Sequence, residues 1–436
     1  MLCVGPQKRS RPASILCIKH VVISALMETT KKDLSVSARN YARNAIVLGL
    51  LSAVGPFAID MYLPALPSIA GDLKASTAAT QMTLMAFFMA FGVCQLIYGP
   101  LSDVVGRKPP LYAGLTLFIV GSIGCAFAPS VEWLIAARVV QGIGAAAGMV
   151  IPRAIIRDLH TGNEATRLMS LVMLVFSVSP ILAPVTGSAL IVPFGWRAVF
   201  VAVMIAAVLA FALIVVFLPE TRLHHQRLEA NVRSVLRGFG HLLADPRFLG
   251  LTFIGGFGMA SFFAFLASSS FIYIGHYGLT PTQYSFGFSI NAFGFIGASQ
   301  FAATLGRRFG LSRVVMTAAA IYTFFALLLL GVTLAGVDSL AVLIALLFMS
   351  FAFLGLVIPT TMVLTLEEHG PIAGIASSLA GTLQMVAGGA VIALASLFFD
   401  GHPLPMVAII AACACCALCL SLVTLRRDAL APQPAE

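Results

Sequence analysis

Charge is the scarcest property of this sequence. Only 10% of its 436 residues are Asp, Glu, Lys or Arg, whereas a soluble globular domain carries about 25%. Hydrophobic residues make up 59% of the chain, and the mean hydropathy is +0.99. A soluble fold must cover its core with polar surface, and this composition does not supply enough of it. The shortage of charge therefore predicts an integral membrane protein.

Other absences disfavour further classes of protein. Stretches such as Val201–Phe217 and Ala318–Leu330 lack the alternation of apolar and polar residues that a transmembrane β-strand needs. No stretch is typical of a nucleic-acid-binding domain. The apolar segments hold no paired acids, histidine cluster or nucleophile beside a base, so an enzyme is not expected. A receptor would bring a soluble signalling domain, for which the chain has no room.

Cysteines are few, and half of the eight lie close together near the C-terminus. These four are Cys413, Cys415, Cys416 and Cys419. No His or acid lies beside them, and a free Cys behaves as a small hydrophobe, so we interpret them as packing residues and expect no metal site.

What the chain has in abundance is long apolar segments, each near the length of about 20 residues that spans a bilayer. Twelve such segments follow one another, at about 45–67, 80–100, 109–128, 132–155, 167–191, 197–218, 248–275, 283–305, 313–335, 339–364, 371–398 and 404–425. The fold class predicted is an all-α membrane protein with twelve transmembrane helices in two pseudo-symmetric six-helix halves.

The longest connection follows the sixth segment and divides the chain. The expected parts are a basic tail over 1–44, a six-helix half over 45–218, a basic linker over 219–247, a second six-helix half over 248–425 and a C-terminal tail over 426–436. The tail is a poor signal peptide, and Met27 is an alternative translation start.

Basic residues predict the orientation, because Lys and Arg collect on the cytoplasmic side of a membrane protein. With the N-terminus inside, the outer connections hold only Lys74 and Arg197, and all the other basic connections are internal. Both termini are therefore expected in the cytoplasm.

Two residues stand out because charge inside a bilayer is costly and is usually functional. Asp60 lies in the first segment and Arg138 in the fourth. A carboxyl group in an apolar setting can bind and release protons near neutral pH, so Asp60 is a candidate proton carrier; the alternative is a solvated residue near the membrane surface. Arg138 is a candidate counter-charge to Asp60 or an anchor that binds backbone carbonyls.

The fifth segment carries Pro180, Pro184 and Gly187. Prolines break the backbone hydrogen-bond ladder and bend a helix, which permits rocking between two states; a static kink is the alternative. Polar, aromatic and sulfur-containing residues elsewhere are candidates to line a substrate cavity, or else they join helices or face lipid. They are Tyr62, Gln95, Gln141, Met149, Phe262, Phe265, Asn291, Gln384 and Met385.

Several of these strings resemble motifs of the major facilitator superfamily. Gly99–Lys108 resembles its signature between helices 2 and 3, of which Gly306–Gly310 is a degenerate second copy, as expected of two repeated halves. Arg138–Gly144 resembles its helix 4 motif, and Ala183–Gly187 resembles its antiporter motif in helix 5.

Three further strings resemble the bicyclomycin/chloramphenicol resistance (Bcr/CflA) subfamily of drug:proton antiporters. They are Asp60–Pro67, Arg153–Leu159 and Leu218–Thr221. The resemblance implies export of small amphipathic drugs across a bacterial inner membrane, driven by proton influx, with no cofactor and usually as a monomer. Where some relatives carry a second acid two turns before Asp60, this chain has Ser52. Carriage of a small metabolite, by uptake or export, is the competing reading.

The loop signature predicts a conformational latch. Gly99, Asp103, Gly106 and Arg107 belong to it, and Asp158 at the inner end of the fourth segment is placed to pair with Arg107. Asp103 can also complement the positive end of a nearby helix. Such contacts would close the inner side when the carrier faces outward.

Overall fold

The computed structural model describes residues 41, 43–159, 162–221, 232–369 and 372–430, and all regular structure in them is helical. The predicted N-terminal tail, with Met27, lies almost wholly outside the described residues. The same holds for 222–231 of the predicted linker and for 431–436 of the predicted C-terminal tail.

The N-terminal half begins with a span over Arg43–Asp72, which ends in the short helices η1 (Leu63–Ala65) and α2 (Leu66–Asp72). Five further helices complete it: α3 (Thr77–Val105), α4 (Lys108–Ala126), α5 (Val131–Leu159), α6 (Gly162–Phe194) and α7 (Arg197–Phe217). Continuous apolar sequence explains their length, because a helix satisfies its backbone hydrogen bonds internally where no water is available.

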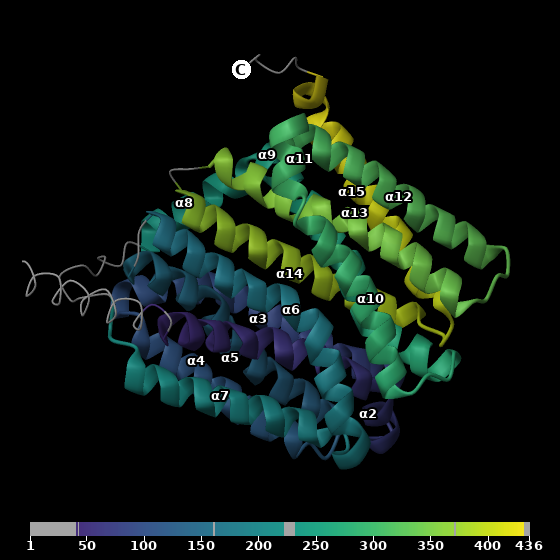
Figure 1. Ribbon diagram of the computed structural model, residues 1–436, viewed down its shortest axis with the longest axis horizontal. Coiled ribbons are helices and arrows are strands. Elements are labelled where there is room, and N and C mark those ends of the chain that lie inside the picture. Colours follow the sequence, from purple (N-terminus) through teal and green to yellow (C-terminus); the bar gives the residue numbers. More distant parts are fainter. Residues whose placement is uncertain (1–40, 42, 160–161, 222–231, 370–371, 431–436) are drawn as a thin grey trace, which may run out of the picture.

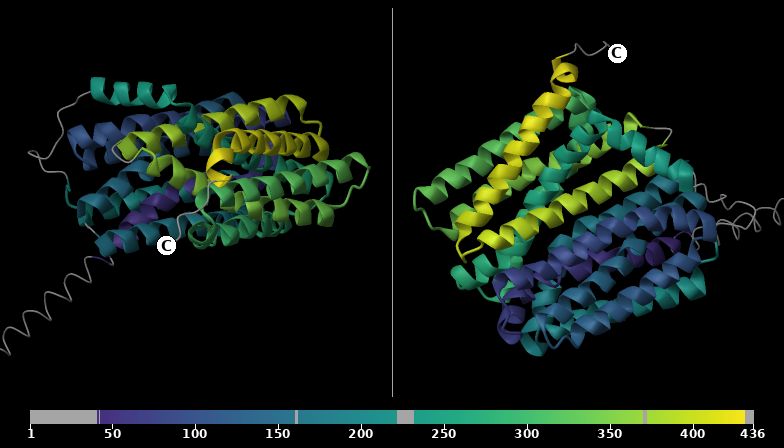
Figure 2. Two further views of the ribbon diagram at one scale, coloured as in Figure 1. Left: turned by 90° about the horizontal axis from the view of Figure 1, so that it is seen from above. Right: turned by 180° about the vertical axis from the view of Figure 1, so that it is seen from behind.

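The C-terminal half is built in the same way. It consists of α9 (Pro246–Ser270) with its π-helical extension η3 (Phe271–His276), α10 (Pro281–Ser299), α11 (Ala302–Phe309), α12 (Leu311–Leu334), α13 (Leu340–Glu367), α14 (Ala373–Phe398) and α15 (Pro403–Leu430). Figures 1 and 2 show this half, green to yellow, beside the N-terminal half, purple to teal.

Eleven helices of the described chain are long and apolar enough to cross a membrane, and they match eleven predicted segments in order. The predicted segment 283–305 differs. It is split into α10 and α11, because turn hydrogen bonds from the backbone N–H of Gln300 and Phe301 replace α-helical ones. The polar residues that lower its apolarity, such as Ser285 and Asn291, bond inside the molecule. With α10 added to these eleven helices, the fold has twelve spans, and α10 is the eighth of them in chain order. It packs against α6 and α13.

The two halves meet along two pairs of helices, α3 with α14 and α6 with α10. Thr382 of α14 donates a hydrogen bond of 2.7 Å to the backbone oxygen of Gly92 in α3. The rings of Phe88 and Phe263 stack with centroids 4.0 Å apart. The contacts between the halves therefore include both apolar ring stacking and single hydrogen bonds.

A short helix that the sequence analysis did not predict lies in the linker. α8 (Val232–Ala244) packs against α14, and Leu242 joins a small buried cluster with Ala376, Leu379 and Ala380. The spacing of Val235, Leu236, Phe239, Leu242 and Leu243 is the amphipathic signal that identifies such a helix.

The ends of the bundle differ in charge. Because successive helices run in opposite directions, Arg107, Arg157, Arg247 and Arg308 collect at one end, called the basic end below. The opposite end carries the ion pair of Arg197 with Asp72.

Candidate functional site

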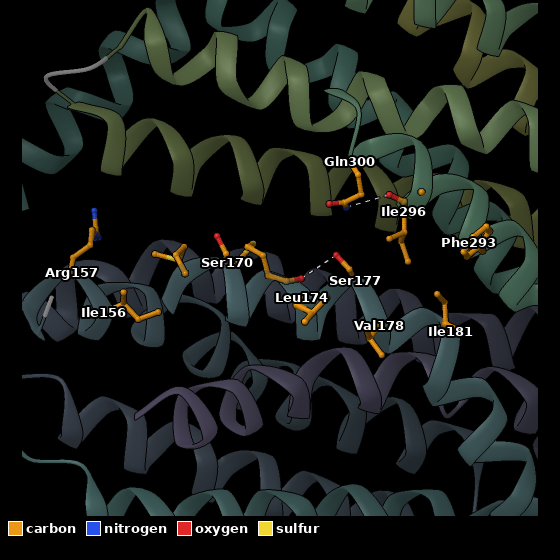
Figure 3. Close-up of a pocket in the computed structure, with 13 residues that line it drawn as sticks. Ile156, Arg157, Ser170, Leu174, Ser177, Val178, Ile181, Phe293, Ile296 and Gln300 are labelled. Atoms are coloured by element: carbon orange, nitrogen blue, oxygen red, sulfur yellow. Dashed lines mark hydrogen bonds between the residues drawn. The ribbon is translucent and has the colours of Figure 1, made fainter. Parts of the chain in front are cut away.

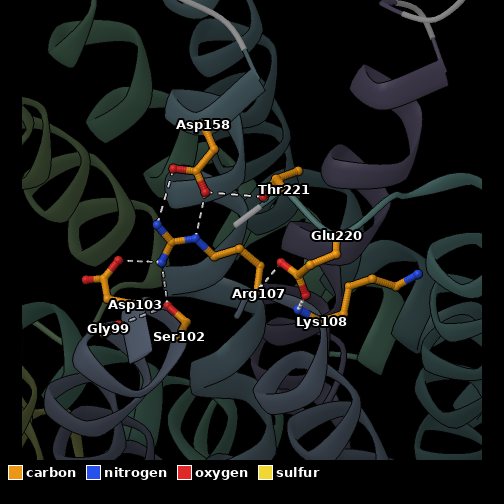
Figure 4. Close-up of polar contacts among 8 residues, drawn as sticks. All are labelled: Gly99, Ser102, Asp103, Arg107, Lys108, Asp158, Glu220 and Thr221. Carbon is orange, nitrogen blue, oxygen red and sulfur yellow. Dashed lines mark hydrogen bonds and ion pairs between the residues drawn. The ribbon is translucent and has the colours of Figure 1, made fainter. Parts of the chain in front are cut away.

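Arg107 is the centre of an ion-pair cluster at the basic end (Figure 4). Its guanidinium donates to Asp158 at 2.7 Å from Nε and 3.3 Å from Nη2, and to Asp103 and Ser102 from Nη1 at 2.7 and 2.8 Å. The side chain is 4% exposed. Burial opposes its charge, but the bonds to Asp158 and the charge of Asp103 hold the pKa of Arg107 above its ordinary value. The predicted pair of Arg107 with Asp158 is thus present, together with Asp103.

Glu220 completes the cluster, and the sequence analysis quoted it only as part of a string. Its carboxylate accepts the backbone N–H of Arg107 at 2.9 Å and of Lys108 at 3.0 Å, where α4 begins. A carboxylate at the first turn of a helix satisfies free N–H groups and complements the dipole. Thr221 donates to Asp158 at 3.2 Å. The chain after α7 is therefore fastened to the same cluster.

Gly99 and Gly106 shape this loop. Gly106 has φ of +102°, a conformation that favours glycine, and it turns the chain from α3 into α4. The carbonyl of Gly99 accepts a hydrogen bond of 2.9 Å from Ser102, which in turn contacts Arg107. Both glycines thus position groups of the cluster.

Asp60 lies in the first span, buried and 6% exposed. The hydroxyl of Ser179 in α6 donates to its carboxylate at 3.3 Å. Ser179 is itself fully buried. A buried carboxylate with one neutral donor is costly to keep charged, so the arrangement suits a group that exchanges a proton. Ser179 was quoted in the proline string but was not singled out by the sequence analysis.

Arg138 is fully buried in α5 and does not pair with Asp60 among the described residues. Its Nη1 donates to the backbone oxygen of Ala58 at 3.2 Å and to Oε1 of Gln141 at 2.6 Å. The guanidinium carbon lies 4.6 Å from the ring centroid of Tyr62 and 4.4 Å from that of Phe87. Arg138 was predicted either as a counter-charge to Asp60 or as an anchor that binds backbone carbonyls. The geometry is that of the anchor, because Arg138 binds the first span at Ala58, two residues from Asp60.

α6 stays helical through Pro180 and Pro184. At Gly187 a side chain would collide with the backbone of Met61, so glycine lets α6 approach the first span beside Asp60. The predicted helix-bending residues therefore lie on the helix that also supplies Ser179.

A cavity of about 840 Å³ lies between α6 and α10 (Figure 3). It runs from Ile181 and Phe293 in the middle of the bundle, past Gln300 at the end of α10, to Arg157 at the basic end. Beyond it the helices are joined, because Ser289 of α10 donates to the oxygen of Ile181 at 2.9 Å and Ser285 donates to that of Pro184 at 2.8 Å. The cavity is therefore closed toward the opposite end.

None of the nine residues predicted for a cavity lines this one. Tyr62 and Gln141 contact Arg138 instead, and Asn291 donates to the hydroxyl of Tyr273 at 3.3 Å. The others lie in the packing between helices: Gln95 beside Gly381, Met149 beside Arg153, Phe262 and Phe265 against Phe351, Gln384 beside Gly255 and Met385 beside Gly92. Polarity alone does not tell a cavity residue from one that joins helices.

The C-terminal half has its own polar cluster at the basic end. Arg247 donates to Glu368 at 2.6 Å, and His369 contacts Asp245 at 3.0 Å through Nε2. Asp245 also caps α9 by accepting the N–H of Arg247 at 2.8 Å. The end of α13 is thereby fastened to the start of α9, as α5 is fastened to α4 in the other half.

Comparison with known proteins gives a family match over most of the chain. The model of the Major Facilitator Superfamily matches residues 48–393. An uncharacterized MFS-type transporter of Bacillus subtilis, YdgK, is 37% identical over 352 residues, which is 80% of this chain and 87% of the relative.

Two further relatives are named for drug resistance. A bicyclomycin resistance protein homolog of Haemophilus influenzae is 31% identical over 373 residues, 84% of this chain and 92% of the relative. Multidrug resistance protein D of Escherichia coli is 29% identical over 355 residues, 81% of this chain and 88% of the relative.

Among solved structures, a D-xylose-proton symporter matches with a TM-score of 0.66 at 16% identity, over 87% of this chain and 96% of that chain. A partially occluded, inward-open form of the xylose transporter XylE from E. coli also has a TM-score of 0.66, at 15% identity, over 89% and 98%. At such identities the likeness concerns the fold.

Proposed function

The chain belongs to the major facilitator superfamily of membrane transporters, and from that premise we propose that it exports small amphipathic drugs in exchange for protons. The names of the drug-resistance relatives support the cargo class. An apolar cavity with few polar groups suits such cargo, because it binds apolar surface without demanding one hydrogen-bond pattern.

One observation carries the proposal. Val178 and Ile181 of α6 line the cavity, whereas Ser179, between them in sequence, binds Asp60. At 3.6 residues per turn, Ser179 points about half a turn away from the face that lines the cavity. The cargo cavity and the acid therefore lie on opposite faces of one helix segment, so a shift of α6 changes both.

We place the basic end in the cytoplasm, because Lys and Arg collect there. The cavity then opens toward the cytoplasm or the inner leaflet, and the serine contacts of α10 with α6 close the outer side. Cargo enters from inside, and a rocking motion of the halves exposes it outside. The cluster around Arg107 keeps the inner ends of α4 and α5 in one arrangement during that motion.

Proton entry supplies the energy. Protonation of Asp60 removes the charge that Ser179 contacts, which alters the bond between the first span and α6. Each proton moving inward yields about 2.3 kcal/mol per 100 mV of membrane potential, before any pH gradient. The superfamily mechanism needs no cofactor beyond this gradient.

The test is uptake of radiolabelled chloramphenicol into inverted membrane vesicles that hold the protein at high level. Acidifying the vesicle interior should drive uptake, and a protonophore should abolish it. Vesicles without the protein give the control. Movement of the drug with the protons, rather than against them, would favour the metabolite-uptake alternative.

A further inference from the structure

We propose that the cavity selects its cargo by charge, taking amphipathic anions in preference to lipophilic cations. The inference rests on the proposed function and assigns its substrate class more narrowly. It concerns the 13 residues that line the cavity between α6 and α10 (Figure 3).

Only one of these lining residues is ionised, and it is basic. Eight have apolar side chains and one is glycine: Ile156, Met169, Met173, Leu174, Val178, Ile181, Phe293, Ile296 and Gly297. Ser170, Ser177 and Gln300 are neutral, and Arg157 carries the charge. Arg157 is an exposed side chain where the cavity reaches the basic end, so cargo meets its charge on entering.

Two acids near the cavity make contacts elsewhere. Asp158 follows Arg157 directly but is bound by Arg107 and Thr221. Asp60 is 6% exposed and contacts Ser179 on the far side of α6. No acidic side chain in the described part of the chain forms an ion pair with Arg157. Its guanidinium is therefore available to cargo that enters the cavity.

Two of the three neutral polar residues already donate hydrogen bonds within the protein. Ser177 donates its hydroxyl hydrogen to the oxygen of Met173 at 3.1 Å. Gln300 donates its amide to Ile296 at 3.3 Å and to Ser299 at 3.2 Å. Recognition of a carboxylate or sulfonate thus falls to Arg157, whose guanidinium has the fork geometry that such groups fit.

The cargo that this geometry fits has an apolar body for the α6–α10 wall and an acidic head group near the basic end. A lipophilic cation of the same size would meet like charge at the mouth of the cavity. Arg157 therefore acts as a specificity-determining residue.

The experiment compares two probes in the inverted vesicles: the anion 8-anilinonaphthalene-1-sulfonate and the cation ethidium. The wild type should transport the anion with a kcat/KM at least about tenfold higher than for the cation, the effect of one charge-assisted contact. Arg157→Gln should lower the anion-to-cation ratio about tenfold, and Arg157→Glu should invert it. Arg157→Lys keeps the charge and should keep most of the preference.

Arg308→Gln is the matched control, because Arg308 is an exposed arginine at the basic end that does not line the cavity, and it should leave the ratio unchanged. Equal transport of the two probes by the wild type, or an unchanged ratio in Arg157→Gln, would overturn the proposal while chloramphenicol efflux continued. Arg157 would then contribute only to the orientation of the chain in the membrane, as one of the basic residues on the cytoplasmic side. Failure to move any of the three compounds would overturn the proposed function itself.

Discussion

Ser179 and Asp60 are joined by a hydrogen bond of 3.3 Å between α6 and the first span, and Val178 and Ile181, on either side of Ser179 in sequence, line the cavity between α6 and α10. A proton and a cargo molecule would thus act on two faces of the same helical turn. Coupling then needs no long path, because one displacement of α6 alters both sites. The predictions below test the parts of this arrangement.

The contacts of Arg107 predict that Asp158 contributes more to the stability of the fold than Asp103 does. Asp158→Asn removes the carboxylate that binds the buried guanidinium twice, so we expect a loss of about 1–3 kcal/mol in unfolding free energy. Asp103→Asn should lose less, because its side chain is 36% exposed. Thermal unfolding in detergent measures both changes.

The same variants test whether the Arg107 cluster, by holding the inner ends of α4 and α5 together, supports transport. Asp103→Asn should slow transport without abolishing drug binding, because the cluster fixes helix ends rather than the cavity. Transport rate and equilibrium binding are compared at equal expression. An unchanged transport rate would remove the latch function of Asp103.

Arg138 should not be replaceable by lysine. An ammonium group does not reproduce the planar contact with Tyr62 and Phe87 together with the bond to Ala58. We expect Arg138→Lys to lower transport about tenfold or more. Arg197→Lys is the control, since Arg197 also lies over a ring, that of Trp196, but at the exposed opposite end. Equal behaviour of the two variants contradicts a role for the buried arginine.

Close approach of α6 to the first span predicts that Gly187→Ala is destabilising. The added methyl group meets the backbone of Met61, so we expect a cost of about 1–3 kcal/mol. Gly331→Ala in α12 has open space around it and should be neutral or slightly stabilising. A denaturation series of both proteins in one detergent decides the point; equal stabilities speak against tight packing at Gly187.

Asp245 should stabilise the basic end in a pH-dependent way. Burial raises its pKa, but hydrogen bonds from His369 and from the N–H groups of Arg247 and Phe248 outweigh burial and hold the pKa below the ordinary value. A carboxyl group with a depressed pKa stabilises the fold above its unfolded pKa of about 4, and the stabilisation is lost as the pH falls through the folded value.

Two substitutions separate the contributions of Asp245. Asp245→Asn keeps a good helix cap but loses the charge, so its Tm should lie below that of the wild type at pH 7 and approach it below about pH 4. Asp245→Ala also loses the cap, which costs about 1 kcal/mol more. A wild-type advantage over Asp245→Asn that does not shrink as the pH falls below about 4 is inconsistent with this account.

The sequence predicted the architecture well because a bilayer leaves few alternatives to long apolar helices. It also predicted the pair of Arg107 with Asp158, since both are charged residues at helix ends. The contacts of Arg107 with Asp103, Ser102 and Glu220 were not predicted. Such residues can be identified as functional candidates from the sequence because charge is rare in this chain.

Other residues of the site cannot be predicted from residue type. Ser179 differs from the neighbouring Ser177 only in the direction that α6 gives its side chain, toward Asp60 rather than into the cavity. Gln141 and Asn291 are polar but bond within the bundle, whereas apolar Val178 lines the cavity. Direction depends on how helices pack in three dimensions, which periodicity alone does not determine.

The central claim is that Asp60 carries the exchanged proton, and the most direct test is drug-driven proton movement in inverted vesicles that hold Asp60→Asn. Adding chloramphenicol to wild-type vesicles with an acidic interior should release protons, whereas Asp60→Asn should bind the drug and release none. Asp72→Asn, an exposed acid of the same span, should behave as the wild type. Full proton release by Asp60→Asn at equal expression would contradict the account.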